Sequence, residues 1–404
     1  MNRPSFPMPF IRGAMRLAAE VVNLTWLSKR PAAWDRLVAE SLWPNPYYAR
    51  RVVTAHAAGG IAGPDLRCLV VTCGAALLAL LPFQPGHARV GFTSRASSAW
   101  TSPYILHSTP LITRDDAPPV VEALLDAMPR AGKNKLWLFP TLSRDDPASA
   151  ALQAGFARRS WASAIAAPFE RPVLDRRESY EQFARAHLSG NRRAGLRRTA
   201  KRLGEQGVLE TRRVGPEDGP ALGAAVEAFL NLERQGWKGF RGTAMASRPE
   251  TAAFTRAVFG PPGNDGGGDP VQPRADLLCL DGRPVAVSLS LVCGGTAHLV
   301  KTAYDERLAR YGPGVLLEDA LVRALHEEDF AARLDSASVA DGLMGALYPD
   351  RERMGDLIVA AGPDLTPARL ARLATQEEGK RAALCAAKRL YWRALDACVR
   401  PTSG

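Results

Sequence analysis

The chain has 404 residues, 46% of them hydrophobic and 23% charged, which excludes a mainly disordered protein and exceeds the length of one ordinary core. Its 52 Lys and Arg against 41 Asp and Glu give a net charge of +11, which favours anionic partners without choosing among them. The six cysteines form no Cys-x-x-Cys pair and have no His at a zinc spacing, so we predict reduced thiols and no metal site.

The first half of the chain alternates helix and strand patterns after an amphipathic lead-in over residues 1–30, which has no signal-peptide core. We predict helices over Pro31–Ala57, interrupted by the two prolines of WPNPYY, and over Pro118–Met128 and Ala148–Ala154. Strands are predicted over Leu136–Phe139 and Trp161–Pro168. The apolar stretch Cys68–Phe83 is too short to cross a membrane, and Gly74 divides it, so it predicts a buried hairpin. Without an export or membrane signal, we expect the protein in the cytoplasm.

A polar segment that begins at Glu170 and contains Pro172 is predicted to be a linker, which divides the chain into domains 1–170 and 171–404. Beyond it, helices are predicted over Ser179–Leu188, Asn191–Leu203, Gly219–Arg234, Thr251–Phe259, Gly314–Ala331 and Pro367–Cys398. Strands are predicted over Leu209–Val214, Leu277–Leu280, Val285–Val292, Thr296–Thr302, Ala332–Ser336 and Gly355–Ala360, with a surface loop at Gly260–Gln272. The alternation indicates α/β domains.

Two glycines suggest an internal repeat. Gly74 and Gly282 each stand between two apolar strand patterns, and they lie 208 residues apart (282 − 74). This spacing, about half the chain, is consistent with two copies of one domain.

The turn Gly312-Pro313-Gly314 stands between a predicted strand and a predicted helix. A helix start offers free backbone N–H groups and the positive end of the helix dipole, and glycines let a pyrophosphate approach the backbone. The turn lacks the glycine spacings of P-loops and of dinucleotide-binding motifs, so those two functions are disfavoured. The same pattern is also typical of an ordinary turn before a helix.

Three stretches together resemble GNAT-fold acyltransferases of the CelD/BcsL type: KTAYDERLARYGPGVLL from Lys301, NRRAGLRRTAKRLGEQG from Asn191 and LERQGWKGFRGTA from Leu232. They resemble the family's strand, loop and acyl-CoA helix, its basic opening helix and its Glu-x-x-x-Trp-Lys-Gly segment. The resemblance runs from about residue 175 to 360. It implies tandem GNAT-like domains, each a mixed central sheet flanked by helices, the first degenerate because it lacks a Gly-Pro-Gly loop. It also implies acetyl-CoA or another acyl-CoA as co-substrate, and no metal.

Direct acyl transfer requires an anchor for the donor phosphates, an N–H for the carbonyl oxygen, a base for the acceptor and a proton for the leaving thiolate. For the anchor, the resemblance points to Arg310, Tyr311, Gly312, Pro313, Gly314, Val315 and Leu316, acting mainly through their backbone. The oxyanion donor is expected in the strand Val300–Ala303. No covalent intermediate is required, because no Cys has a neighbouring His.

The other candidate residues are divided between catalysis and acceptor binding. The catalytic candidates are Glu233 as the first choice of base, Asp335 as a second base, Lys301 as a charge facing the cleft and Tyr304 as the proton donor to the thiolate. The acceptor-binding candidates are Trp237, Lys238 and His298, the last of which is expected on the face of its strand opposite to Lys301. Each has an ordinary alternative as a solvated or packed side chain.

The sequence leaves three functions open. The first is acyl transfer from acyl-CoA to a polysaccharide, a lipid-linked sugar or an amine. The second is a FemABX-like aminoacyltransferase that uses aminoacyl-tRNA, and the third is a non-catalytic assembly factor for exopolysaccharide. The basic helix Asn191–Leu203 fits a solvated face, a contact to CoA phosphates or an anionic acceptor, or a contact to RNA or membrane. It contains no aromatic residue, which disfavours nucleic acid as a partner.

Overall fold

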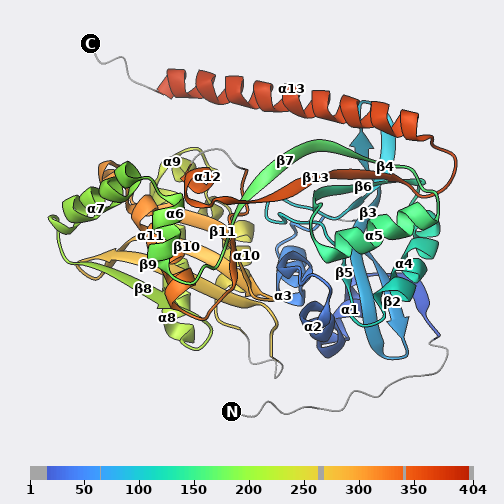
Figure 1. The fold of residues 1–404 in the computed structure, drawn as a ribbon, viewed down its shortest axis with the longest axis horizontal. Helices are drawn as coiled ribbons and strands as arrows, with labels where there is room; N and C mark the ends of the chain where they lie inside the picture. Colours follow the sequence, from blue (N-terminus) through green and yellow to red (C-terminus); the bar gives the residue numbers. More distant parts are fainter. Residues whose placement is uncertain (1–15, 64, 263–267, 340–342, 400–404) are drawn as a thin grey trace.

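The computed structural model describes residues 16–63, 65–262, 268–339 and 343–399, of which 389 and 392–399 are described in their backbone only. Two lobes lie side by side and share one mixed sheet flanked by helices (Figure 1). This confirms the α/β fold class. The lead-in predicted over residues 1–30 and the loop predicted at Gly260–Gln272 lie partly outside the described residues.

The first half contains β1 (Ala18–Val22), α1 (Leu24–Ser28), α2 (Pro31–Glu40), η1 (Pro46–Tyr48), α3 (Arg50–Ala58), β2 (Arg67–Cys73), β3 (Ala76–Val90), β4 (Ser94–Ala99), β5 (Leu111–Ile112), α4 (Ala117–Ala131), β6 (Leu136–Ser143), α5 (Pro147–Arg158) and β7 (Ser163–Asp175). The second half contains α6 (Tyr180–His187), α7 (Gly190–Gly204), β8 (Leu209–Val214), α8 (Gly219–Gln235), α9 (Trp237–Phe240), η2 (Met245–Ser247), α10 (Pro249–Phe259), β9 (Gln272–Leu280), β10 (Arg283–Cys293), β11 (Thr296–Tyr304), η3 (Glu306–Tyr311), α11 (Pro313–Glu327), β12 (Arg333–Asp335), α12 (Leu343–Leu347), β13 (Asp350–Ala360) and α13 (Pro367–Val399).

The two halves repeat one order of elements. Each has a first strand followed by helices, then the hairpin β2–β3 or β9–β10, and then β4 or β11, a helix, and a strand parallel to it. The hairpins turn at Gly74 and Gly282, whose φ angles of 58° and 76° lie in the left-handed region that glycine adopts without strain. The repeat suggested by these two glycines is therefore present in the fold.

The halves exchange their last strands. The strand order is β1-β2-β3-β4-β6-β13-β7-β12-β11-β10-β9-β8, so β13 lies between β6 and β7, and β7 lies between β13 and β12. Each half thus places its last strand next to a strand of the other half, in antiparallel pairing. The long helix α13 follows β13 and lies across β7 (Figure 1).

The segment from Glu170 is not the predicted linker. It is the second part of β7, in which Arg171, Val173 and Leu174 are buried. Its polar residues and Pro172 suggested a connection between domains, whereas the exchange buries the strand between β12 and β13. The predicted division between residues 170 and 171 falls inside this shared strand and stays a prediction.

The facing surfaces of the two lobes are packed together. Val52 of α3 and Val258 of α10 belong to the same cluster of buried apolar side chains. Beside them, Arg51 Nε lies 2.6 Å from Asp269 Oδ2, an ion pair between the halves. The position of first-half residues relative to β11 and α8 is thus fixed by core packing.

Glu318 on α11 gives the fold a pH dependence. Its side chain is buried, the Tyr348 hydroxyl donates to it, and burial raises the pKa of the carboxyl to about 7. A raised carboxyl pKa stabilises the fold at low pH, and this stabilisation is lost as the pH rises from the ordinary value of 4.5 through about 7. The difference between these two pKa values corresponds to about 3 kcal/mol in the free energy of unfolding.

We expect the free energy of unfolding to fall between about pH 5 and about pH 8, and Glu318→Gln to remove most of that fall. Urea denaturation at both pH values measures the effect. Equal losses in the parent and the variant would show that another group is responsible.

Candidate active site

Helix α11 begins at the turn that the sequence indicated. Its N-cap, Gly312, has a φ of 57° in the left-handed region, and no side chain caps the helix. The first backbone N–H groups of a helix have no partner within the helix and carry the positive end of its dipole. A Cβ on Gly314 would lie 3.2 Å from Cδ1 of Tyr304, so the Tyr304 ring lies over this bare backbone. The start of α11 therefore has the features of an anion site.

The corresponding helix of the first half, α4, starts differently. Its N-cap is Asp116, which has a similar φ of 54° and follows Asp115. Two carboxylates at a helix start repel phosphate. The first half therefore keeps the backbone geometry of the turn without its anion-binding chemistry, which agrees with a degenerate first domain.

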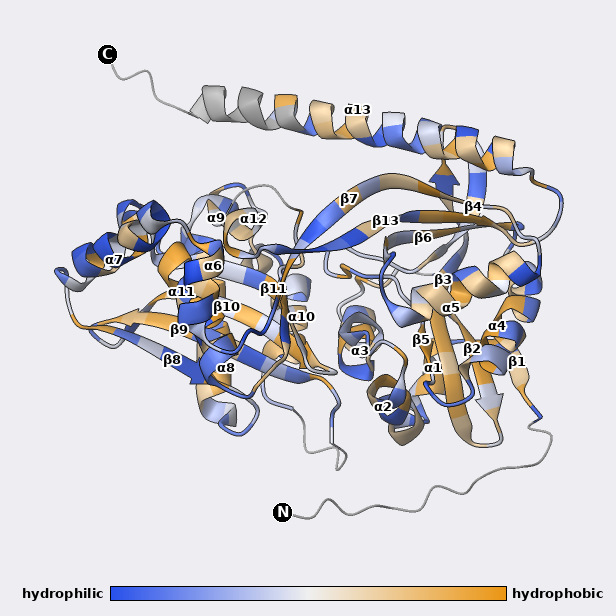
Figure 2. Cartoon of the chain, viewed as in Figure 1, coloured by the Kyte–Doolittle hydropathy of each residue, from blue (hydrophilic) through white to orange (hydrophobic). Residues whose placement is uncertain are grey.

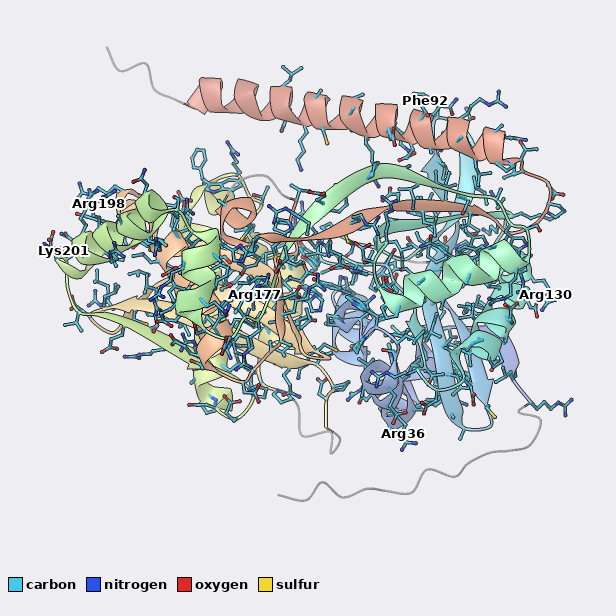
Figure 3. The ribbon with its side chains drawn as sticks, viewed as in Figure 1. Arg36, Phe92, Arg130, Arg177, Arg198 and Lys201 are labelled. Atoms are coloured by element: carbon cyan, nitrogen blue, oxygen red, sulfur yellow. The ribbon has the colours of Figure 1, made fainter. Side chains whose placement is uncertain are left out.

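Helix α7, which lies against the start of α11, carries a group of cations. They are Arg192, Arg193, Arg197, Arg198, Lys201 and Arg202. Within the described part of the chain, none of them forms an ion pair with a carboxylate. Figure 2 shows α7 as mostly hydrophilic, and Figure 3 shows Arg198 and Lys201 at the end of the molecule away from the first half.

The side of α7 that faces α11 also has unused donors. A Cβ on Gly312 would lie 3.3 Å from Cγ2 of Thr199, which places α7 directly against the start of α11. The Nε atoms of Arg192 and Arg193 are buried and have no hydrogen-bond partner among the described residues. The Arg202 guanidinium lies 5.8 Å from the centre of the Tyr311 ring, so this cation of α7 lies at the start of α11 with its free backbone N–H groups.

The predicted anchor residues contribute mainly their backbone. Tyr311 and Leu316 are buried in an apolar cluster with residues of β9 and β10. Arg310 Nη2 donates to the Tyr311 hydroxyl at 2.8 Å, and the Arg310 guanidinium lies over the same ring. These side chains hold the turn in place, and the N–H groups of the turn remain for a ligand.

One edge of β11 is open next to this turn. β11 pairs with β12 only from Thr296 to His298, so from Leu299 to Tyr304 this edge has no strand partner among the described residues. On its other edge, Lys301 pairs with Leu289 and Leu299 with Ser290, which leaves Val300 as a bulge. Bulges redirect backbone groups and are frequent beside active sites.

The bulge changes which side chains share a face. Lys301 lies opposite Leu289 and His298 opposite Leu291, and residues opposite each other in an antiparallel pair point to the same side. Leu289 and Leu291 both belong to the apolar cluster that includes α8. Lys301 and His298 therefore share one face, and the prediction of opposite faces was wrong because the extra residue Val300 shifts the alternation.

A polar cluster lies on this face. Lys238 Nζ contacts Glu233 Oε1 at 2.8 Å, and the backbone N–H of Met245 donates to Glu233 Oε2 at 2.7 Å. Both oxygens of Glu233 are thus engaged in holding the turn after α8. Lys301 has no such partner among the described residues, and its Nζ lies 5.6 Å from the centre of the Tyr104 ring. Burial, followed by the charge of Lys238, lowers the pKa of Lys301, while Glu233 raises it.

A small pocket lies beside the cluster. It has a volume of about 40 Å³, and Glu233, Trp237, Lys238 and Tyr304 are among the residues that line it. Trp237 is half-exposed, and its backbone N–H donates to Glu306 Oε1 at 2.8 Å. The fold thus brings four of the predicted site residues to one pocket at the end of β11.

The remaining two predicted residues pair with each other deeper in the sheet. His298 Nδ1 lies 3.3 Å from Asp335 Oδ2, and Arg171 Nη1 lies 3.3 Å from the same oxygen. Burial raises the pKa of Asp335, but Arg171 and His298 more than offset this and hold the pKa below its ordinary value. Asp335 is therefore an ion-pair partner at this position, and it lines no part of the small pocket.

The second half matches a known family model. Residues 190–337 match the model described as an acetyltransferase (GNAT) domain. The match covers 148 of the 404 residues (337 − 190 + 1) and supports an acyltransferase, as predicted, while the narrower resemblance to the CelD/BcsL type stays a prediction. No curated protein sequence gives a significant match.

Three solved structures are similar to this chain at low sequence identity. FemX is 11% identical, with a TM-score of 0.51, and the match covers 88% of this chain and 99% of FemX. The C-terminal domain of a putative lysylphosphatidylglycerol synthetase from Agrobacterium fabrum is 15% identical, with a TM-score of 0.49 and coverage of 86% and 95%. A tandem GNAT protein from the clavulanic acid pathway is 14% identical, with a TM-score of 0.38 and coverage of 86% and 100%. At these identities, the match to FemX shows the shared fold alone.

Two residues next to the GNAT site were missed from sequence. Tyr104 lies in a Ser- and Pro-rich loop of the first half, and Arg171 lies in the segment predicted to be a linker. No motif marks either residue, because both reach the GNAT domain through the packing and strand exchange between the halves.

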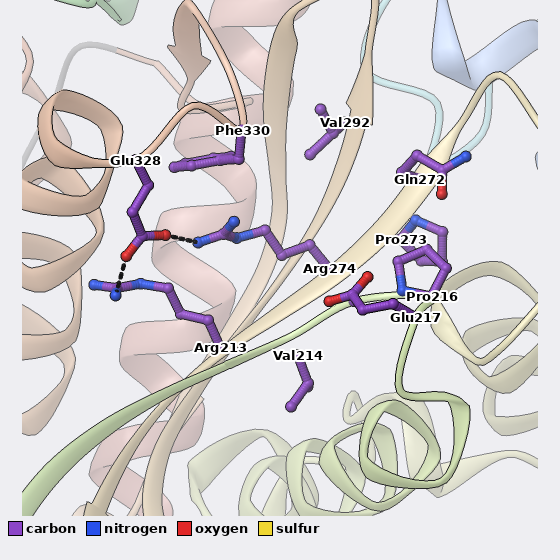
Figure 4. Close-up of a pocket in the computed structure, with 11 residues that line it drawn as sticks. Arg213, Val214, Pro216, Glu217, Gln272, Pro273, Arg274, Val292, Glu328 and Phe330 are labelled. Carbon is purple, nitrogen blue, oxygen red and sulfur yellow. Dashed lines mark hydrogen bonds and ion pairs between the residues drawn. The ribbon is translucent and has the colours of Figure 1, made fainter. Parts of the chain in front are cut away.

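A larger cavity of about 440 Å³ lies at the other end of the GNAT domain, near the end of α11. In it, Glu328 bridges Arg213 and Arg274, and the Arg274 guanidinium lies 3.6 Å from the centre of the Phe330 ring (Figure 4). Its charges neutralise one another, and none of the predicted site residues lines it.

Two further findings concern metal ions and membranes. In the described ranges, no three His, Cys, Asp or Glu side chains are grouped so that they could hold a metal ion. None of the helices described there is both long and apolar enough to span a membrane.

Proposed function

We propose that this chain transfers an acyl group directly from acyl-CoA to an amine or hydroxyl of an acceptor, in the cytoplasm. Acetyl-CoA is the simplest donor, and a sugar of a polysaccharide, a lipid-linked sugar or a small amine is the acceptor class. The observation that carries the proposal is the open edge of β11, which runs from the bulge at Val300 to the glycine turn that begins α11.

The donor is bound by backbone groups and cations. The N–H groups of Gly314 and Val315 bind the pyrophosphate, and Arg202 of α7, whose guanidinium lies over the Tyr311 ring at this turn, adds charge beside it. The extended arm lies along the free edge of β11, where backbone groups are available to it. The bulge at Val300 supplies the N–H that stabilises the thioester oxyanion.

The acceptor approaches from the face of α8. Trp237 is an exposed aromatic surface on which a sugar ring can stack, and Lys238 adds a positive charge. Lys301, with its lowered pKa and no acidic partner bound to it, takes the proton of the attacking nitrogen or oxygen. As the new bond to the carbonyl carbon forms, the carbon–sulfur bond breaks, and the Tyr304 hydroxyl protonates the thiolate.

In this proposal Glu233 positions other groups. Its two oxygens hold Lys238 and the N–H of Met245, so it orders the turn after α8 and tunes Lys301 through its charge. This assigns the base to Lys301 in place of Glu233, the first choice from sequence.

A second candidate is an aminoacyltransferase that uses charged tRNA, like FemX by its name. It is favoured by the cations of α7, which form no ion pair with a carboxylate among the described residues. It predicts binding of tRNA that weakens steeply with salt, because counterion release dominates such contacts. Under the CoA proposal, the same cations bind phosphates of the donor.

The test is calorimetric titration of the full chain with acetyl-CoA. We expect micromolar binding by the parent and binding weaker by about tenfold or more in Gly314→Trp, which fills the phosphate turn. Gly379→Trp is the matched control, because Gly379 is an exposed helical glycine of α13, and a Cβ added to it would have no other group within 4 Å. Its affinity should equal that of the parent.

Circular dichroism checks that each variant is folded. A folded parent that binds neither acetyl-CoA nor CoA would remove the proposed donor, and salt-dependent binding of tRNA by the same sample would favour the second candidate.

A further inference from the structure

Four polar side chains meet where β11 and β12 separate. They are Tyr47 of η1, Arg171 of β7, His298 of β11 and Asp335 of β12, and none is more than 2% exposed. His298 and Asp335 are the last residues paired between the two strands, so the cluster forms the closed end of the open edge of β11. Both halves of the chain contribute to it.

The cluster contains one ion pair, between Arg171 and Asp335. Arg171 donates through Nη2 to the carbonyl of Leu106 at 2.7 Å, and through Nη1 to Asp335 at 3.3 Å. His298 Nδ1 faces the same carboxylate, at 3.3 Å. The rings of Trp43 and Tyr47 meet the His298 ring edge-on, at 5.8 and 5.7 Å. Asp335 thus faces both Arg171 and His298.

Four buried atoms of the cluster have no hydrogen-bond partner among the described residues. They are the Tyr47 hydroxyl, Arg171 Nε and both ring nitrogens of His298, of which Nδ1 faces Asp335 at 3.3 Å. Arg171 Nε can only donate, the Tyr47 hydroxyl has a proton to donate, and His298 Nε2 donates when the ring is protonated. Buried polar groups in native proteins nearly always have partners, so we expect these atoms to bind an acceptor that the described residues do not supply.

We propose that this cluster binds a carboxylate. A carboxylate offers only acceptors, and it fits a guanidinium and a phenol that present protons, together with an imidazole ring in its protonated form. In the acyl-CoA reaction proposed above, on which this inference rests, the carboxylate is the distal group of a short dicarboxylic acyl donor such as succinyl-CoA. His298 lies two residues beyond the Val300 bulge, a separation of about 7 Å that a short acyl chain spans.

The direct test compares succinyl-CoA, acetyl-CoA and CoA by calorimetry with the parent and Tyr47→Phe. We expect the parent to bind succinyl-CoA about tenfold or more tightly than acetyl-CoA, and Tyr47→Phe to lose most of that preference. CoA and acetyl-CoA should bind equally to both proteins. Since the Tyr47 hydroxyl has no partner among the described residues, the variant should melt at the same temperature as the parent or higher.

Tyr48→Phe is the matched control. The neighbouring Tyr48 is equally buried, but its hydroxyl donates to the carbonyl of Trp100 at 2.9 Å. Tyr48→Phe should melt at a lower temperature and keep the full preference for succinyl-CoA. The two variants therefore separate a ligand-binding hydroxyl from a structural one.

The remaining outcomes decide the source of the carboxylate. If succinyl-CoA has no advantage, but free succinate binds the CoA-saturated parent and not Tyr47→Phe, the carboxylate belongs to the acceptor. If succinyl-CoA binds no better than acetyl-CoA, and free succinate binds the parent no better than Tyr47→Phe, the inference is wrong. The unpartnered atoms are then satisfied by water. If none of the CoA compounds binds, the proposed function itself fails, and the inference fails with it.

Discussion

Replacing Asp335 with asparagine is expected to lower the free energy of unfolding by about 3–5 kcal/mol. Asp335 is 1% exposed and is the acid that compensates Arg171, which is itself 2% exposed. The amide keeps the shape of the side chain but removes its charge, so the Arg171 guanidinium is left buried without an opposite charge. Urea denaturation of the parent and the variant at neutral pH measures the loss.

The matched control is Asp364→Asn. Asp364 pairs with Lys135, and both side chains are more than half exposed. The same chemical change at this exposed pair should alter the free energy of unfolding by less than about 1 kcal/mol. Similar losses in the two variants would contradict the role of Asp335 as the buried charge partner of Arg171. They would show instead that removing any one negative charge lowers the free energy of unfolding.

Local sequence predicted those parts of the fold that depend on local conformation. Gly74, Gly282 and Gly312 all have left-handed φ angles at the turns where they were expected. A hairpin and a helix start are decided within a few residues, so the chain itself carries their signal. The segment that matches the GNAT model could likewise be recognised from sequence, because its motifs are contiguous in the chain.

Features that depend on distant partners were not predictable in this way. The second part of β7 resembles a linker in sequence because Arg171 and Pro172 lie on a strand that is enclosed only by β12 and β13, which follow much later in the chain. The bulge at Val300 arises from the register between β10 and β11, and it places Lys301 and His298 on one face. A single sequence contains no sign of such a register shift, since the side-chain alternation around it is otherwise regular.

Replacing Lys301 with methionine is expected to lower the turnover of acetyl-CoA by about 100-fold or more, with little change in the affinity for CoA. Methionine keeps much of the apolar stem but cannot accept a proton. Lys301→Arg should lose activity as well, because a guanidinium remains charged at all accessible pH values. Release of the CoA thiol, measured with a panel of amines and sugars, reports turnover, and calorimetry reports binding.

The pH dependence separates a base from a residue that only packs. A base must be neutral, so turnover should rise with pH through the pKa of Lys301, which lies below its ordinary value of 10.5. Lys238 lowers this pKa and Glu233 raises it. Lys238→Met should therefore shift the midpoint of the profile to higher pH, and Glu233→Gln should shift it to lower pH. Shifts in the same direction, or a profile unaffected by either change, would assign the base to another group, whereas opposite shifts identify Lys301 as the group that titrates.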